Sequence, residues 1–216
     1  MTISREECHA DEEALARAIR SRIVPGDRVV FLSPDTPAIL IAQFAVRLAA
    51  GILIALKPGL APAEVRCLRD HSEASLLSYD AESGCSESGV AIGHDSCLFF
   101  GSTIATDESP VRWEIDDERA VISINYTTGK PKGVMCSHRG ACLTAMGEVF
   151  HNGLDNKSVY LWTLPLFHCN GWCTPLAVTA ASGIHACLRA VRAASFWAVS
   201  TTSGSPTSAG HRQSAT

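Results

Sequence analysis

Apolar residues recur with two different periods along the first 80 residues of the chain. Stretches with the helical period alternate with short, almost continuous apolar runs, which are typical of buried strands. The pattern predicts three helices, at Asp11–Ile23, Pro37–Ala50 and Pro62–His71, and three strands, at Arg28–Leu32, Ile52–Leu56 and Ala74–Tyr79. Such an alternation is typical of a mostly parallel sheet with helical crossovers, so we expect an α/β fold.

The second half of the chain begins with a segment that lacks a clear period. Residues 82–109 are rich in Ser, Gly and Asp, and we expect a surface loop there with one short strand near Val90–Ile92. Beyond it we expect strands at Ala120–Tyr126 and Val134–Ser137 and a helix at His138–Phe150. The predicted folded region is therefore residues 1–192. Residues 193–216 are dominated by Ser and Thr without periodicity, which predicts a disordered tail of unrelated sequence.

Composition narrows the class of protein only moderately. The chain is 46% hydrophobic and 19% charged, as expected of a globular protein, and its net charge of -4 gives no reason to expect nucleic acid as a partner. The most apolar stretch, Ile39–Leu56, is interrupted by Gln43 and Arg47, so we expect no transmembrane segment. Nine cysteines and the lack of a signal peptide favour the reducing cytoplasm.

The most informative segment follows the predicted strand that ends at Tyr126. Residues 126–134 are Tyr-Thr-Thr-Gly-Lys-Pro-Lys-Gly-Val, which combines hydroxyls, glycines and two lysines in one turn. Backbone N–H groups of such a turn can converge on phosphate oxygens, while Lys132 adds a positive charge. The Walker spacing of glycines and lysine occurs nowhere in the chain. A triphosphate loop and an ordinary turn with surface lysines therefore both remain open from these residues alone.

The same segment resembles the phosphate loop of the acyl-activating, AMP-forming synthetases, whose pattern is Tyr-Thr-Ser-Gly-Thr-Thr-Gly-x-Pro-Lys-Gly-Val. A second block at residues 159–172, Val-Tyr-Leu-Trp-Thr-Leu-Pro-Leu-Phe-His-Cys-Asn-Gly-Trp, is similar to the next motif of that family. A third stretch, Gly26–Asp80, also resembles the family through Gly-Asp-Arg-Val, Pro-Asp-Thr-Pro and Leu-Ala-Pro-Ala-Glu-Val. The resemblance implies a partial N-terminal adenylate-forming domain, with the family's C-terminal domain absent.

The resemblance also implies a reaction. In this family a carboxylate attacks the α-phosphate of ATP, which gives an acyl-adenylate and pyrophosphate, and the thiol of coenzyme A then displaces AMP. Mg²⁺ accompanies ATP. The chain would accordingly descend from an acyl-CoA synthetase, a ligase of fatty acids or other carboxylic acids.

Residue roles are carried over from the two motifs. In the family, the loop would hold the β- and γ-phosphates, and the histidine of the second motif would neighbour the substrate carboxylate, with the following residues shaping the acyl pocket. An alternative for His168 is a core histidine whose nitrogens are satisfied by the backbone. The expected cofactor-binding residues are Thr127, Thr128, Gly129, Lys132 and Gly133, and the expected substrate residues are His168, Asn170, Gly171 and Trp172.

A zinc site is a weaker alternative for the second motif. His168, Cys169, Cys173 and Cys187 supply metal-ligating atoms. They contain no Cys-x-x-Cys pair, however, and buried cysteines are common without any metal. We therefore predict no metal ligands here.

Two departures from the family pattern bear on activity. The loop is three residues shorter than the pattern, and three residues span at most about 10 Å of chain. All 22 acidic residues lie at or before Asp155, so the acidic magnesium ligand that the family places further downstream has no counterpart. We expect the chain alone to be inactive as a ligase. The alternatives are a non-catalytic remnant or binding module, and a chain completed by a separate polypeptide.

Overall fold

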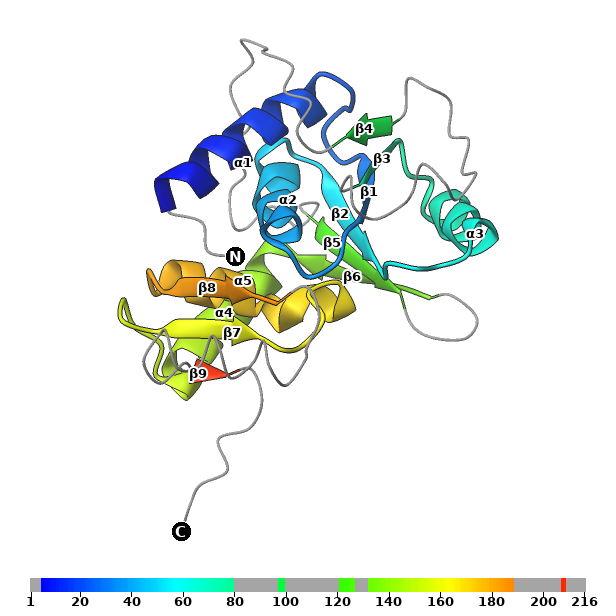
Figure 1. The fold of residues 1–216 in the computed structure, drawn as a ribbon. Coiled ribbons are helices and arrows are strands. Elements are labelled where there is room, and N and C mark those ends of the chain that lie inside the picture. Colours follow the sequence, from blue (N-terminus) through cyan, green and yellow to red (C-terminus); the bar gives the residue numbers. More distant parts are fainter. Residues whose placement is uncertain (1–4, 80–96, 100–120, 127–131, 189–206, 209–216) are drawn as a thin grey trace.

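The computed structural model describes residues 5–79, 97–99, 121–126, 132–188 and 207–208 (Figure 1). The chain begins with helix α1, which spans Arg5–Arg20, earlier than predicted at both ends. After the turn at Pro25 and Gly26, strand β1 covers Arg28–Leu32, the predicted range. Helix α2, Pro37–Leu48, follows with its proline in the first turn, where a missing N–H costs no hydrogen bond.

The main sheet has six strands in the order β4-β3-β1-β2-β5-β6. Neighbouring strands from β4 to β5 run parallel, whereas β6 returns antiparallel to β5. Helix α3, Pro62–Ser72, crosses between β2 and β3. The expected α/β fold with a mostly parallel sheet is therefore confirmed. The strands after β1 are β2 (Ile52–Leu56), β3 (Leu76–Tyr79), β4 (Cys97–Phe99), β5 (Val121–Tyr126) and β6 (Gly133–Ser137).

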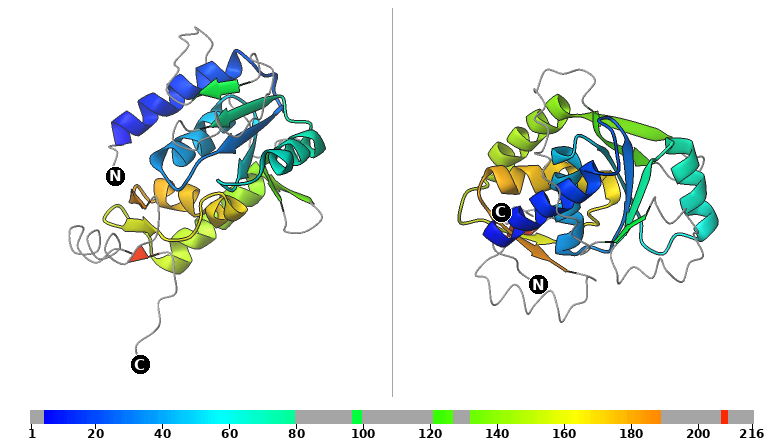
Figure 2. Two further views of the ribbon diagram at one scale, coloured as in Figure 1. Left: turned by 45° about the vertical axis from the view of Figure 1, so that its right-hand side comes forward. Right: turned by 90° about the horizontal axis from the view of Figure 1, so that it is seen from above.

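Both faces of the sheet are covered, as the uninterrupted apolar runs of its strands require. Side chains of β1 alternate: Val29 and Phe31 pack with α1 and α2, while Val30 and Leu32 pack with α3. The view from above shows α1 and α2 on one side of the strands and α3 on the other (Figure 2). The sheet and these helices form the main core of the molecule.

Strand β4 lies in the segment that was predicted to be a loop. It pairs parallel with β3 at the edge of the sheet, so its conformation depends on hydrogen bonds to a distant segment. Edge pairing of this kind leaves little local signal, because strand preference depends on the neighbours. The predicted strand at Val90–Ile92 lies outside the described residues.

A smaller sheet packs against the same core. After β6 come helix α4, His138–Asn152, and strand β7, Val159–Trp162, which pairs parallel with β8, Ile184–Cys187. Tyr160 and Trp162 of β7 face the core shared with α2. The connection from β7 to β8 contains a 3₁₀ helix, η3, at His168–Cys173 and a short helix, α5, at Thr174–Ala180.

The third strand of the small sheet comes from the segment that we predicted to be a tail. Strand β9, Thr207–Ser208, pairs parallel with Tyr160 and Leu161. The rest of residues 193–216 lies outside the described residues, so the boundary at residue 192 stays a prediction.

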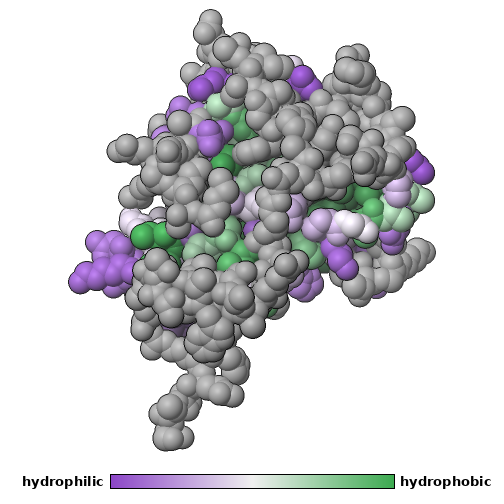
Figure 3. Space-filling model, in the orientation of Figure 1, coloured by the Kyte–Doolittle hydropathy of each residue, from purple (hydrophilic) through white to green (hydrophobic). Residues whose placement is uncertain are grey.

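Apolar surface is distributed unevenly. Figure 3 shows green apolar areas beside purple polar ones on one face of the molecule. Of the eight exposed large apolar side chains among the described residues, five belong to β6 and α4, which we call the β6–α4 face: Val134, Met135, Leu143, Met146 and Phe150. Among the described residues, no helix combines the length and apolar character that a membrane crossing demands.

Candidate functional site

The candidate phosphate loop connects two strands of a hairpin. Tyr126, the last residue of β5, pairs with Gly133, the first residue of β6, so residues 127–132 form the connection. Because β1, β2 and β5 run parallel, this connection leaves the same edge of the sheet at which β1 and β2 end. Ligands of open α/β sheets bind at this carboxyl edge. Thr127, Thr128 and Gly129 lie outside the described residues, whereas Lys132 is exposed just before β6.

Gly133 has a packing reason to be glycine. A Cβ atom built on it would lie 2.9 Å from Cγ2 of Ile124, a contact that real Cβ atoms essentially never make. Ile124 lies on β5, across the hairpin. The absence of a side chain at Gly133 therefore lets the two strands approach where the loop closes.

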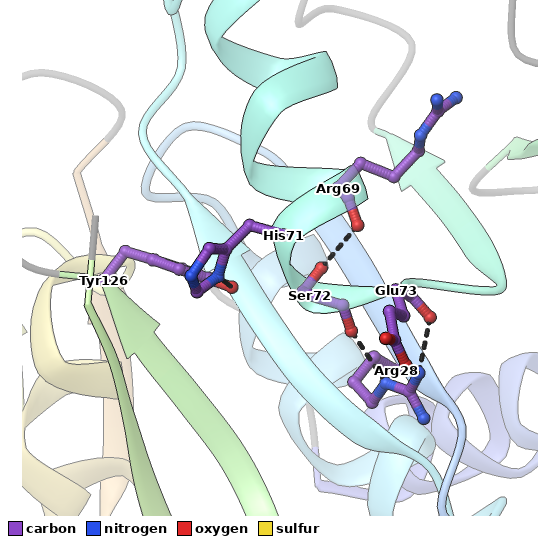
Figure 4. A network of polar contacts seen from close by, with 6 residues as sticks. All are labelled: Arg28, Arg69, His71, Ser72, Glu73 and Tyr126. Atoms are coloured by element: carbon purple, nitrogen blue, oxygen red, sulfur yellow. Dashed lines mark hydrogen bonds and ion pairs between the residues drawn. The ribbon is translucent and has the colours of Figure 1, made fainter. Parts of the chain in front are cut away.

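The strand end that enters the loop is tied to the end of α3. The Nδ1 atom of His71 lies 3.0 Å from the hydroxyl oxygen of Tyr126, and the two rings meet edge to face with centroids 5.6 Å apart. Burial raises the pKa of the Tyr126 phenol above its usual value, so the hydroxyl stays protonated and can donate. Figure 4 shows this contact between α3 and β5.

The end of α3 is in turn held by β1. The guanidinium of Arg28 donates to the carbonyl oxygens of Ser72 and Glu73 at 2.8 and 2.7 Å, and it forms an ion pair with the Glu73 carboxylate at 3.2 Å (Figure 4). These carbonyls belong to the last turn of the helix, where no intrahelical donor is available. Arg28 thus fixes α3, and α3 positions Tyr126 at the base of the loop.

The second motif is anchored by a long-range hydrogen bond. The backbone N–H of Leu166 donates to Oδ1 of Asp35 at 2.7 Å, across 131 positions of sequence. Asp35 follows β1 in the Pro-Asp-Thr-Pro turn before α2. Partial burial raises the pKa of this carboxyl, and the bond from Leu166 opposes that rise. The segment before η3 is therefore fastened to the carboxyl edge of the main sheet.

The residues expected at the substrate are brought together in η3. His168 is the first residue of η3 and is exposed, and its N–H donates to the carbonyl of Pro165 at 3.1 Å. Asn170 and Trp172 belong to the same element by their backbone. Because η3 packs beside β5 and β2, the second motif lies next to the strand that leads into the loop.

Gly171 requires glycine for two reasons. Its φ of +62° lies in the left-handed region, which side chains with a Cβ rarely adopt. A Cβ atom there would also lie 3.0 Å from Cζ3 of Trp162 and 3.2 Å from Cδ of Pro175. The turn of η3 therefore rests directly on the buried indole of Trp162.

The Trp162 indole is held from its other edge by His185. Its Nε1–H donates to Nδ1 of His185 at 3.1 Å, and the two rings stack with planes only 10° apart. An indole nitrogen can only donate, so Nδ1 of His185 must be the acceptor. The proton of the neutral imidazole is therefore on Nε2, which lies 3.0 Å from the hydroxyl oxygen of Thr179. Burial lowers the pKa of His185 to about 4. His185 is a neutral structural residue.

The structure also bears on the metal alternatives. Within the described ranges no group of three His, Cys, Asp or Glu side chains could hold a metal ion. Burial raises the pKa of the Cys187 thiol to about 12, which disfavours the thiolate that a zinc ligand needs. Mg²⁺ is usually held by one or two carboxylates together with substrate phosphates and waters, so no step is assigned to it here.

Three positioning residues were not predicted from the sequence. Asp35 had been assigned only to the turn before α2, although a carboxylate at the end of a strand is a signal for this edge. His71 and Tyr126 stood in family-like motifs, but their contact joins residues 55 positions apart.

The fold matches solved adenylate-forming enzymes over almost the whole chain. The o-succinylbenzoate coenzyme A synthetase MenE of Bacillus subtilis, solved with ATP and magnesium ion, superimposes with a TM-score of 0.80 at 19% identity, covering 93% of this chain and 55% of that one. ATP-bound MatB of Rhodopseudomonas palustris gives a TM-score of 0.78 at 19% identity, covering 93% and 42%. The architecture is therefore that of part of such an enzyme.

The chain belongs to the AMP-binding enzyme family, whose sequence profile matches residues 1–207. The peroxisomal acetate/butyrate–CoA ligase AAE7 of Arabidopsis thaliana is 32% identical over 215 residues, covering 83% of this chain and 38% of the relative. The acetate–CoA ligase CCL3 of Humulus lupulus is 30% identical, covering 78% and 36%. The chain thus spans less than two fifths of the length of these curated relatives.

Proposed function

We propose that this chain carries the part of an AMP-forming acid–CoA ligase that receives the phosphates of ATP and the carboxyl end of the acid. The observation that carries the proposal is the placement of η3 beside β5, the strand that ends in the candidate phosphate loop. Strand β5, which leads into the first motif, and η3, which contains part of the second, are adjacent in space although they are separated in sequence. A carboxylate near η3 would therefore be close to a nucleotide held at the end of β5.

The roles proposed for individual residues are those that the resemblance of the two motifs to the family implies. Lys132 would neutralise phosphate charge from its exposed position, and the turn containing Thr127, Thr128 and Gly129 would donate hydrogen bonds. Gly133 would contribute by letting the hairpin close. His168 would orient the substrate carboxylate, on an η3 turn whose shape depends on Gly171. Asn170 and Trp172 would border the acid.

The acid itself would be a small or aromatic carboxylic acid or a fatty acid. Acetate, butyrate and benzoate appear in the names of relatives, which differ in substrate while sharing this region. Coenzyme A would be the acceptor. The short loop and the lack of carboxylates after Asp155 support the further proposal that this chain alone does not complete the reaction. We place it in the cytoplasm on its cysteine content, although several relatives are named as peroxisomal.

The test compares nucleotide binding with catalysis by the purified chain. We expect Mg–ATP to bind by calorimetry and to bind several-fold more weakly to Lys132→Ala, because one phosphate-facing cation is lost. Lys157→Ala is the matched control, since Lys157 is an exposed lysine in the turn before β7. We expect no exchange of pyrophosphate into ATP with acetate, butyrate or benzoate. Exchange would refute the inactivity, and an absence of binding would refute the phosphate loop.

The second candidate is a binding module that is completed by another polypeptide. The β6–α4 face favours it, because β6 is an edge strand and its Met135 is 70% exposed while Phe150 of α4 is 82% exposed. Exposed edges and apolar patches of this kind are normally covered. The occupant would be a polypeptide that corresponds to the part of its relatives outside the matched region.

A co-elution experiment tests the second candidate. The partner is the part of AAE7 that follows the matched region. We expect the two polypeptides to co-elute, and we expect Met135→Lys combined with Phe150→Glu to abolish the complex. Val24→Lys is the control, since Val24 is equally apolar and 65% exposed but lies in the turn before β1. A complex that tolerates the double substitution, or no complex at all, would exclude this face as the interface.

A further inference from the structure

One amide of the main sheet makes no hydrogen bond within the described part of the chain. Asn125 precedes Tyr126, the last residue of β5, and its Oδ1 atom is buried without a partner among these residues. A buried polar atom without a hydrogen bond lowers the stability of a fold. Such atoms are rare in native proteins, and functional sites are where they are expected. The Asn125 amide is therefore a candidate for contact with a ligand.

Asn125 faces the side of the sheet on which η3 lies. Side chains of a strand alternate between its two faces, and Ile124 and Tyr126 pack with the cluster below α3. Asn125 therefore projects from the opposite face, where α2 and Trp162 contribute to the main core. The turn of η3 rests on the Trp162 indole through Gly171, and η3 packs beside β5. Asn125 is thus the last side chain of β5 on the η3 side of the sheet.

This face of the hairpin is accessible at its end. Asn125 is paired with Val134 of β6, and directly opposed residues of an antiparallel pair project from the same face. Val134 is 54% exposed, whereas Ser123, the preceding residue of β5 on this face, is buried. A ligand can therefore approach the sheet at Asn125 but not one step further along the strand.

The chemistry of a carboxamide indicates which group it would contact. The amide donates through its nitrogen and accepts through its oxygen, and a half-turn exchanges the two positions. An uncharged donor can bind a carboxylate oxygen without leaving a buried charge behind when the site is empty. The cation that we assign to the phosphates, Lys132, is instead exposed before the start of β6. An anionic oxygen on the η3 side is therefore the group for which an amide is suited.

We propose that Asn125 is a further substrate-binding residue, whose amide donates a hydrogen bond to a carboxylate oxygen of the acid. The inference rests on the proposed function, because that function supplies a carboxylate beside η3. It adds a residue to which the two motifs assign no role. It also accounts for a polar side chain at a position where an apolar one would cost less: the amide gains its partner when the acid binds.

Benzoate binding to the full chain tests the inference. The affinity is measured by ligand-observed NMR in the presence of Mg–ATP, and the free energy of unfolding is measured for each variant. Asn125→Val keeps a strand-forming side chain and should weaken benzoate binding several-fold. It should leave the free energy of unfolding unchanged or raise it, because no hydrogen bond within the described chain is lost.

A charged variant sharpens the test. Asn125→Asp has almost the same shape and should weaken benzoate binding by about tenfold, because two carboxylates in contact repel each other. Benzamide has the shape of benzoate without its charge, and its amide can donate to an aspartate. We therefore expect Asn125→Asp to retain benzamide binding. A loss of both probes in a folded variant would mean that the substitution disrupts the site and that no donor to the carboxylate has been removed.

Ser78→Ala is the matched control. The Ser78 hydroxyl is also buried without a partner among the described residues, but it lies on β3, which β1 and β2 separate from β5. We expect this variant to bind benzoate as the wild type does.

The outcomes separate the inference from the proposed function. Unchanged benzoate affinity in Asn125→Val would overturn the inference, and a loss in His168→Ala alone would leave the acid site standing without Asn125. If the wild type bound no benzoate, both the inference and the proposed acid site would fail. The Mg–ATP titration decides the phosphate loop independently of either result.

Discussion

Helices α2 and α4 both follow a strand of the same sheet, yet they are stabilised differently. Helix α2 has no side-chain hydrogen bond at its N-cap, but nine of its residues are buried, including Ile39, Ala42 and Val46. Helix α4 has a capping hydrogen bond from the N–H of Gly140 to the Ser137 hydroxyl, but it buries only Ala141 and Ala145. Tertiary packing therefore determines α2, whereas local interactions carry a larger share of the stability of α4.

The same contrast extends to the neighbouring strands. Phe31 of β1 is completely buried between α1 and α2, whereas Met135 of β6 is 70% exposed. Helix α4 is apolar on its outer side as well, at Leu143, Met146 and Phe150. A helix that is apolar on both sides is expected to be covered on both sides. The N-terminal layer, which consists of β1 with helices α1 and α2, therefore has its apolar side chains buried. The apolar side chains of the β6–α4 face are instead exposed to solvent.

The largest expected effect compares one substitution in the two regions. Phe31→Ala should lower the free energy of unfolding by about 3–5 kcal/mol, because it removes a fully buried ring and leaves a cavity. Phe150→Ala should change it by less than about 0.5 kcal/mol, because that ring is 82% exposed. Chemical denaturation of both variants measures the difference. Similar losses at the two sites would show that the β6–α4 face is covered in solution.

The N-terminal layer was also the part that the sequence predicted best. The strands at Arg28–Leu32 and Ile52–Leu56 have the predicted bounds, because each is a continuous apolar run between turn residues. Helix α1 begins at Arg5, six residues before its predicted start, since the acidic first turn expected at Asp11 lies inside the helix instead. Local sequence patterns therefore predicted which helices and strands form, but they located the ends of the helices less accurately.

The candidate site was predictable only in outline. The order of the two motifs and their place after β5 follow from the sequence pattern. The hydrogen bond from Leu166 to Asp35 does not, because it joins segments 131 positions apart. Arg47 interrupts an apolar run in the sequence, and only the fold reveals that its guanidinium nitrogens Nε and Nη1 are buried. Contacts of this kind depend on how distant segments are arranged in the fold, and the local periodicity of apolar residues carries no information about that arrangement.

The small sheet offers a pH test of the partly buried contact between Trp162 and His185. His185 has a pKa of about 4 in the folded chain, against about 6.5 in an unfolded one, so the unfolded chain takes up the proton first as the pH falls. The stability that depends on neutral His185 is fully present above pH 6.5. It is lost between pH 6.5 and 4, by about 3 kcal/mol.

The measurement is the unfolding free energy of wild type and His185→Gln at a series of pH values. Glutamine is uncharged and can still accept from the Trp162 indole, so the variant should lack this part of the pH dependence. Carboxylates titrate in both proteins, so their contributions cancel when the unfolding free energy of the variant is subtracted from that of the wild type. Parallel pH profiles would mean that His185 is not kept neutral by burial.

A smaller effect is expected where the second motif joins the N-terminal layer. Asp35→Ala should cost about 1–3 kcal/mol, because the buried N–H of Leu166 loses its acceptor. Asp35→Asn should cost less, since the amide oxygen can replace Oδ1 and the raised carboxyl pKa shows that the charge is disfavoured there. Thermal unfolding ranks the three proteins. An equal loss in both variants would indicate that the charge, and not the acceptor, matters.

The smallest expected effect concerns the cap of α4, and it sharpens the contrast with α2. The Ser137 hydroxyl accepts from the N–H of Gly140 at 3.2 Å, at the start of a helix with little buried surface. Ser137→Ala should lower stability by about 1 kcal/mol, and Ser137→Asp should restore it, because aspartate caps equally well. Thr144→Ala, on the same helix but away from its end, is the control. Hydrogen exchange should locate the change in the first turn of α4. If exchange instead increased throughout the main sheet, α4 would be part of the same cooperative core as α2, and the contrast between the two helices would not hold.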